Sequence, residues 1–190
     1  MLDIKDAKVA IPVVLIAGLF WSFGPYVVRH IDEAQQVPWQ YLFTRGIVIF
    51  IILNLFLYLE EGKDFFYNYK KIGISGLIGG VGLGIAMISF IYSITNTSAA
   101  VTLLCLAAMP FITALLGFMF LKEEISINVW VAISIAAVGI IIMAIDNTSN
   151  NTVIGLVFGL LSSIGFAVFS TTLRWKKDTP KFTTVAIAGL

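Results

Sequence analysis

Apolar stretches of about 20 residues recur along most of the chain, and they limit the folds open to it more than any other feature. A helix of that length crosses a hydrocarbon core of about 30 Å. Lipid offers no hydrogen-bond partner to backbone groups, so a segment inside it has to be helical. The stretches lie at residues 9–28, 37–59, 72–95, 98–121, 127–145 and 152–173, and a seventh begins near residue 182. The sequence therefore predicts an all-α polytopic membrane protein.

The charged residues exclude several other classes of protein. They make up 12% of the sequence, against about a quarter in soluble domains, and the mean hydropathy is +0.97. A net charge of +1, with the basic residues scattered over short loops, argues against nucleic acid as a partner. The loops are also too short to hold a soluble catalytic domain. We expect the lipid bilayer to be the main partner.

The distribution of lysine and arginine predicts how the chain is oriented. If the N-terminus is cytoplasmic, ten of these residues lie on the inner side and only Arg29 lies on the outer side. Cytoplasmic loops carry such an excess of positive charge. We therefore expect a multi-pass protein of the plasma membrane, the bacterial inner membrane, with its N-terminus in the cytoplasm.

Residue types that carry chemistry are scarce. Cys105 is the only cysteine, which excludes an intrachain disulfide and a cysteine metal cluster. His30 is the only histidine and has no companion ligand nearby. No Asp, Glu or His lies within the six spans, so they hold no pair of nucleophile and base. We expect no enzyme, no cofactor and no metal site.

The sequence also contains a weak internal similarity. A shift of 141 residues places Gly18, Ser22 and Gly24 over Gly159, Ser163 and Gly165, and one further residue places Pro38 over Pro180. Five spans separate the two copies, so the second copy runs in the opposite direction, as in many secondary transporters. We expect a first repeat at residues 1–150 and the start of a second, inverted repeat at 151–190. The last residues stop inside an apolar segment, as in a fragment.

The first span carries candidates for a solute pathway in Trp21, Ser22, Gly24 and Pro25. We expect Gly24 and Pro25 to bend or break the helix, because proline removes a backbone hydrogen bond and clashes with the preceding turn. Such breaks expose polar backbone groups at the substrate sites of transporters. A packing kink is the alternative explanation. Trp21 lies near mid-span and not in an interfacial belt, which favours the pathway.

Small residues mark the third and fourth spans. Gly76, Gly80 and Gly84 share one helical face, and this spacing favours close packing between helices over contact with substrate. In the fourth span we expect a bend at Pro110, and Thr102 suits either a helix contact or a cavity wall. The residues after this span, Lys122 to Glu124, indicate by themselves only a solvated cytoplasmic turn.

Arg45 is the only charged residue within the six spans. It lies roughly 12 Å below the outer end of its span, at 1.5 Å per residue. A charge near hydrocarbon costs from about 2.5 to more than 10 kcal/mol, and no carboxylate in the spans neutralises it. We expect Arg45 to face the bundle interior, toward Gln40, Thr44, backbone carbonyls, water or an anionic group of a ligand. Snorkelling toward the outer surface is the alternative.

Together these features resemble the EamA family of the drug/metabolite transporter superfamily. The resemblance rests on Trp21, Ser22, Gly24 and Pro25 in the first span, on Pro38 and Arg45 in the second, and on residues 93–126. Within 93–126, Pro110 is similar to the family's helix-four proline and Glu123 to its terminal glutamate, with Glu124 as an alternative one residue on. The resemblance covers residues 9–145 well and 152–190 weakly.

The resemblance implies a ten-helix carrier made of two inverted five-helix repeats, which works by alternating access around a central cavity. Family substrates include amino acids, other metabolites, nucleotide sugars and drugs, and they are often exported. The second repeat has Ile187 near the position equivalent to Arg45.

Two functions are consistent with these features. The first is a secondary transporter, expected to export small metabolites such as amino acids or drug-like solutes. Its candidate pathway residues are Trp21, Ser22, Gly24, Pro25, Arg45, Thr102 and Pro110, and its structural residues are Gly76, Gly80, Gly84 and Glu123. The second is a non-transporting membrane scaffold or assembly subunit that packs through its glycine faces. A homo-oligomer is compatible with both.

Overall fold

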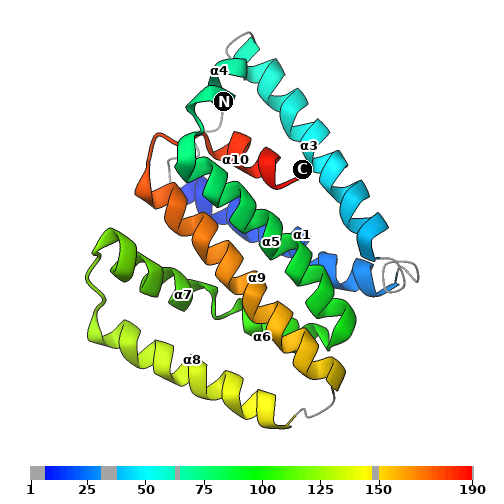
Figure 1. The fold of residues 1–190 in the computed structure, drawn as a ribbon, viewed down its shortest axis with the longest axis vertical. Helices are drawn as coiled ribbons and strands as arrows, with labels where there is room; N and C mark the ends of the chain where they lie inside the picture. Colours follow the sequence, from blue (N-terminus) through cyan, green and yellow to red (C-terminus); the bar gives the residue numbers. More distant parts are fainter. Residues whose placement is uncertain (1–6, 31–37, 63–64, 147–149, 190) are drawn as a thin grey trace.

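The computed structural model describes residues 7–30, 38–62, 65–146 and 150–189, and its regular elements are all helices. This confirms the predicted all-α class for the described residues (Figure 1). The α-helices are α1 (Ala7–His30), α3 (Pro38–Glu61), α4 (Phe65–Lys71), α5 (Gly73–Asn96), α6 (Ala99–Leu106), α7 (Met109–Leu116), α8 (Ile127–Asp146), α9 (Asn150–Trp175) and α10 (Lys181–Ala188). A short π-helix, η2 (Gly117–Leu121), follows α7 directly.

Five of the described helical segments are long and apolar enough to cross a membrane. They are Ile11–Val28, Pro38–Glu60, Gly73–Asn96, Ala99–Leu121 and Val153–Trp175. Within the described residues, α8 contains a further apolar segment, Ile127–Ile142, which is shorter than these five. These segments coincide with the six spans expected from the sequence, so the prediction of a polytopic membrane protein is confirmed.

Helices α5 and α9 form the centre of the molecule, where they lie side by side over most of their length (Figure 1). Glycine lets the two backbones approach. A Cβ atom built on Gly165 would lie only 2.5 Å from the carbonyl oxygen of Gly82. On another face of α5, Gly76 and Gly80 leave space for Thr184 and Ile187 of α10. In lipid, where association has no hydrophobic drive, such close contact is the main source of attraction between helices.

Hydroxyl groups hydrogen-bond across this central packing. All the buried polar side chains among the described residues are serines and threonines. Ser162 on α9 donates to the carbonyl of Ala86 on α5 at 2.9 Å, and Ser93 on α5 donates to the carbonyl of Gly155 on α9 at 2.7 Å. A hydroxyl reaches a backbone carbonyl without bringing a charge into lipid, so these bonds add directional contacts at low desolvation cost.

The fourth span is interrupted near Pro110, as the sequence predicted. Helix α6 ends at Leu106, and α7 restarts at Met109 with the proline in its first turn. Pro110 has no N–H for the carbonyl of Leu106, so the helical pattern cannot continue through it. On the α9 side of this turn, Ser163 donates to the carbonyl of Cys105 at 2.6 Å. The interrupted backbone is thus engaged by a side chain of α9.

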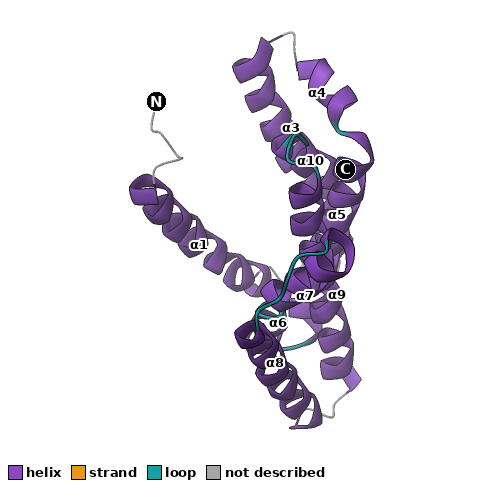
Figure 2. Cartoon of the chain, turned by 90° about the vertical axis from the view of Figure 1, so that its left-hand side faces the viewer, coloured by secondary structure: helices purple, strands orange, loops and turns teal. Residues whose placement is uncertain are grey.

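Helix α1 differs from the expectation. It continues as one helix through Gly24 and Pro25, so the helix does not break there, and a bend stays a prediction. Proline removes one N–H, the donor to the carbonyl of Trp21, and a single lost bond does not end a helix whose flanking turns are intact. Only 11% of its apolar window is buried, against 56% for α5. The N-terminal half of α1 stands apart from the other helices (Figure 2).

The loop between the second and third spans contains a helix that the sequence did not predict. Helix α4 lies against α3, where the hydroxyl of Tyr69 donates to Oδ1 of Asn54 at 2.7 Å. Burial raises the pKa of Tyr69, and the bond to Asn54 lowers it by a smaller amount. The hydroxyl therefore stays protonated at neutral pH and remains a donor.

The glycine contact between α5 and α9 gives a first prediction. Replacement of Gly165 by Ala should lower the thermal unfolding midpoint in detergent, because the new methyl group would meet the backbone of Gly82 and Ala86. Overpacking of this kind costs about 1–3 kcal/mol.

The matched control is Gly139→Ala on α8, where a Cβ atom meets nothing within 4 Å. Circular dichroism during heating would compare the two variants. Equal midpoints would contradict the central role of the contact between α5 and α9.

Candidate functional site

Arg45 lies where α1, α3 and α5 come together, and it lines two cavities. The smaller cavity, of about 150 Å³, is also lined by Trp21 and Gly24 of α1 and by Phe90 of α5. The larger, of about 490 Å³, extends between α3, α5 and α10, with Gly84 and Gly189 in its wall. Arg45 is therefore shared by both cavities.

The guanidinium group of Arg45 has no counter-charge in the part of the chain that the structure describes. It makes no hydrogen bond or ion pair with any residue that the structure describes. Thr44, one of its expected neighbours, donates instead to the carbonyl of Gln40 on its own helix at 2.8 Å. The side chain is half-buried. A cation in this position attracts water or an anionic group into the cavities, because its desolvation is otherwise uncompensated.

An aromatic cluster closes the site on the side of α1. The ring of Trp21 stacks on that of Phe90 at 6.0 Å between centroids, and it meets Phe166 of α9 edge to face at 6.3 Å. Tyr41 of α3 also lines the smaller cavity. Because much of α1 is exposed, Trp21 is a principal attachment of this helix to the centre of the molecule.

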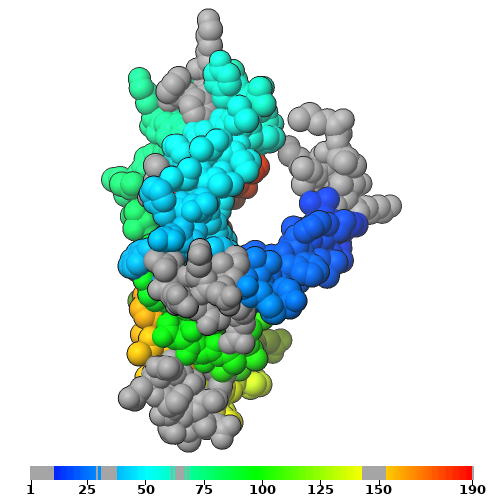
Figure 3. All heavy atoms as spheres, turned by 90° about the vertical axis from the view of Figure 1, so that its right-hand side faces the viewer, coloured from blue at the N-terminus to red at the C-terminus, as the bar shows by residue number. Residues whose placement is uncertain are grey.

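The space-filling view shows the same region from outside. In Figure 3, α1 (blue) diverges from α3 (cyan), and an open gap separates the two. Large apolar side chains face outward along α1, including Phe20 at 75% exposure and Leu19 at 64%. Surface of this kind is compatible with lipid or with further transmembrane helices.

The seven predicted pathway residues do not form a single site. The structure brings together Trp21, Gly24 and Arg45, whereas Ser22 is exposed and donates to the carbonyl of Leu19 on its own helix. Pro25 is buried but lines neither of the two cavities that Arg45 borders.

Thr102 and Pro110 belong to the packing around the interrupted fourth span. The hydroxyl of Thr102 is fully buried and lies 2.9 Å from that of Ser93, and Pro110 is exposed. Of the small-residue face, Gly76 and Gly80 contact α10, and Gly84 lies near the backbone of Ala188.

Glu123, expected at the cytoplasmic turn after the fourth span, forms an ion pair that the sequence did not indicate. Its Oε2 lies 3.0 Å from Nη1 of Arg174 at the end of α9. The Nη2 atom of the same arginine donates to the carbonyl of Thr113 on α7 at 3.3 Å. Both charged side chains are more than 40% exposed, so the pair contributes about 1 kcal/mol at most. It joins the ends of the fourth and sixth spans.

Sequence reasoning missed Tyr41, Phe90 and Phe166 at the site. Aromatic residues are frequent in these spans, and no spacing distinguished the three from the others. The chain has 15 phenylalanines, so only the packing of α1, α3, α5 and α9 selects those beside Trp21 and Arg45.

Comparison with known proteins agrees with this architecture. The model of the EamA-like transporter family matches residues 8–145. The chain belongs to the EamA-like transporter family. The resemblance seen in the sequence is thus confirmed. Trp21, Arg45 and Glu123 all lie within the matched residues.

Individual relatives extend the comparison beyond residue 145. Two proteins named "Uncharacterized transporter", from Helicobacter pylori strains J99 and 26695, are each 26% identical over 167 residues, which is 86% of this chain and 54% of theirs. The chain therefore spans about half the length of these curated relatives. "Uncharacterized protein MJ1333.1" of Methanocaldococcus jannaschii is 25% identical over 134 residues, 70% of this chain and 94% of its own. No solved structure matches.

The attachment of α1 through Trp21 gives a second prediction. Trp21→Ala should increase hydrogen exchange in α1 while α5 and α9 stay protected, because the substitution removes both ring contacts with the centre of the molecule. Aromatic pairs contribute about 0.5–1.5 kcal/mol each beyond their buried area.

Phe23→Ala is the control, since Phe23 lies on the same helix, is 62% exposed and makes no ring contact with the described residues. Mass spectrometry of exchanged peptides would separate the helices. If both substitutions changed the exchange of α1 equally, Trp21 would not be its attachment.

Proposed function

We propose that this protein is part of a secondary transporter that exports small metabolites, such as amino acids or drug-like solutes, by alternating access. The observation that carries the proposal is Arg45, which has no counter-charge among the described residues and borders two cavities within the membrane-spanning helices. A buried charge is retained in a membrane protein when it serves a pathway, a ligand or the assembly. Membership of the EamA-like transporter family favours the pathway.

The proposed roles follow from the positions of the side chains. Arg45 would attract an anionic group such as a carboxylate, and Trp21 with Phe90 would contact an apolar portion of the solute. Gly24 leaves room beside Trp21, since a Cβ atom there meets nothing within 4 Å. A site with one cation and an aromatic wall suits an amphipathic solute.

The arrangement of α3 and α10 supports an inverted repeat with units at residues 1–150 and 151–190. Pro38 begins α3, and Pro180 immediately precedes α10. The helices then come into backbone contact: a Cβ atom on Gly46 would lie 2.6 Å from the oxygen of Gly189. Gly189 is one residue beyond Ala188, the position that the shift from Pro38 to Pro180 makes equivalent to Gly46.

The proposed setting is the bacterial inner membrane, with a cytoplasmic N-terminus. The ion pair between Glu123 and Arg174 joins the end of η2 to the end of α9. These two ends, with Lys122 beside them, therefore lie at the same side of the bundle. The excess of lysine and arginine at that side supports its placement in the cytoplasm.

A non-transporting scaffold is the weaker alternative. Its glycine faces were expected to bind partners, but Gly76, Gly80, Gly159 and Gly165 are occupied by contacts within the chain. Gly18 and Gly24, where an added Cβ atom would meet nothing within 4 Å, are glycines of the first span that remain open to a partner.

Solute counterflow into proteoliposomes tests the proposed role of Arg45. Across a panel of amino acids and other metabolites, the wild type should exchange at least one labelled solute. Arg45→Gln should lower that exchange at least tenfold, because one charge-assisted hydrogen bond contributes about 1.5–3 kcal/mol. Arg45→Lys should retain part of it.

Lys70→Gln is the matched control, since it removes one positive charge from an exposed position on α4. Folded yield by size-exclusion chromatography accompanies each assay. Loss of yield with Arg45→Gln would indicate a structural brace. If both the folded yield and the exchange stayed unchanged, the result would favour the alternative in which Arg45 snorkels toward the outer surface.

A further inference from the structure

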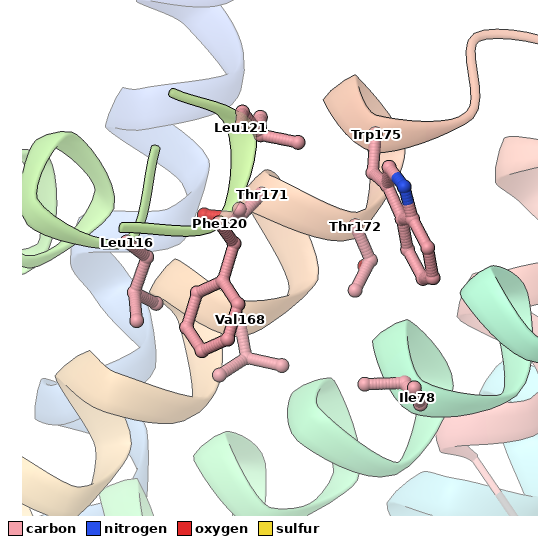
Figure 4. A pocket seen from close by; sticks show the side chains of 8 residues that line it. All are labelled: Ile78, Leu116, Phe120, Leu121, Val168, Thr171, Thr172 and Trp175. Atoms are coloured by element: carbon pink, nitrogen blue, oxygen red, sulfur yellow. The ribbon is translucent and has the colours of Figure 1, made fainter. Parts of the chain in front are cut away.

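A third cavity, separate from the two beside Arg45, lies between α5, α9 and the end of the fourth span. It has a volume of about 360 Å³ and is almost entirely apolar, with Ile78, Leu116, Phe120, Val168 and Trp175 in its wall. Figure 4 shows these side chains around the cavity, with Trp175 at one edge; they come from α5, α7, η2 and α9. Its volume is within the range of about 300–1,000 Å³ that is usual for ligand sites.

The hydroxyl of Thr171 is the unusual feature of this cavity. Thr171 lines the wall, is 6% exposed, and its Oγ1 has no hydrogen-bond partner among the described residues. Its neighbour Thr172 is satisfied by the carbonyl of Phe169 at 2.8 Å. Buried hydroxyls without a partner are rare in folded proteins and require an explanation. The oxygen itself is enclosed, so a rotation of Thr171 about χ1 that turns it toward the cavity would let a ligand there supply the acceptor.

Two lysines stand next to residues of the cavity wall. The wide π-helical turn of η2 ends with Lys122 in a left-handed conformation (φ 57°), directly after Leu121 of the wall. On the facing helix, Nζ of Lys176 lies 5.9 Å from the ring centroid of Trp175. Both lysines are exposed. The apolar cavity is therefore bordered by positive charge at the end of the helices.

The local charge favours an anion at this border. The segments 122–126 and 174–181 hold five basic residues against three acidic ones. The carboxylate of Glu123 is neutralised by Arg174 at 3.0 Å, while Glu124 and Asp178 remain exposed. Basic groups at the ends of transmembrane helices attract the phosphate of anionic lipids.

We propose that this cavity binds an anionic phospholipid of the surrounding membrane. The headgroup phosphate lies between Lys122 and Lys176, an ester carbonyl accepts the hydrogen bond of Thr171, and an acyl chain lies along Phe120 and Val168. The positions of Trp175 and Thr171 fit this order from headgroup to acyl chain, because Thr171 lies one turn, roughly 6 Å along α9, from Trp175. Tryptophan is enriched at the level of lipid headgroups, and the ester groups lie just below them.

Native mass spectrometry of the detergent-purified protein tests the proposal, with phosphatidylglycerol compared to phosphatidylcholine of the same acyl chains. The wild type should retain phosphatidylglycerol preferentially. Lys122→Gln with Lys176→Gln should weaken this binding about 25-fold, since each basic group near an anionic surface contributes about fivefold. Thr171→Val, which removes the hydroxyl at nearly constant shape, should weaken it about fivefold.

Lys70→Gln with Lys71→Gln is the matched control, because it removes the same charge from the end of α4 without altering the border of the cavity. Ile78→Trp adds bulk from a wall residue that is 43% exposed, and it should abolish specific retention even if the lysine variant fails to fold.

Three results would overturn the proposal. Equal retention of the two lipids by the wild type would indicate a groove that takes any acyl chain. Equal loss in the control and the Lys122/Lys176 variant would indicate a diffuse surface charge effect. Undiminished binding by Ile78→Trp would place the lipid elsewhere on the protein. The assay is independent of solute counterflow, so either proposal can fail without the other.

Discussion

The approach of the α5 and α9 backbones at Gly82 and Gly165 is the constraint on which the rest of the structure depends. Lipid tails are as apolar as leucine, so two helices gain nothing by exchanging lipid for each other's large side chains. They gain when glycine and hydroxyl groups bring the backbones into van der Waals contact and supply hydrogen bonds. The contact of Gly165 and the bonds of Ser93 and Ser162 do both. Helix α10 then packs on the glycine face of α5, and the interrupted fourth span packs on α9.

The extent of the helices was predictable from the sequence because one physical rule decides it. A backbone in hydrocarbon has to bond to itself, so long apolar stretches become helices wherever they occur. The interruption at Pro110 was predictable for the same reason, since proline removes a donor. At Pro25 the same rule failed, because one missing donor within α1 does not decide whether the helix continues. Helix α4 lies in a polar loop, where hydropathy carries no signal, and its position depends on the bond between Tyr69 and Asn54.

The candidate site was only partly predictable. Arg45 stands out in the sequence because a charge in a span is costly, and its interior position follows from that cost. Which aromatic residues surround it depends on how α1, α3 and α5 cross, and periodicity does not encode the crossing. For Thr102 the sequence left a helix contact and a cavity wall open. Its hydroxyl lies next to that of Ser93 within the packing of α5 and α6, which corresponds to the first of these.

Two arginines show how the same side chain acquires different roles. Arg174 lies at the end of α9, where Glu123 and the carbonyl of Thr113 satisfy both terminal nitrogens of its guanidinium. Its charge is neutralised by groups of the protein itself. Arg174 therefore orders the end of the bundle and is a poor anchor for a ligand. Arg45 lies within the membrane segment without such partners among the described residues. The unsatisfied charge is the one placed beside cavities, and a fold that needed only rigidity at this position would gain more from an apolar side chain.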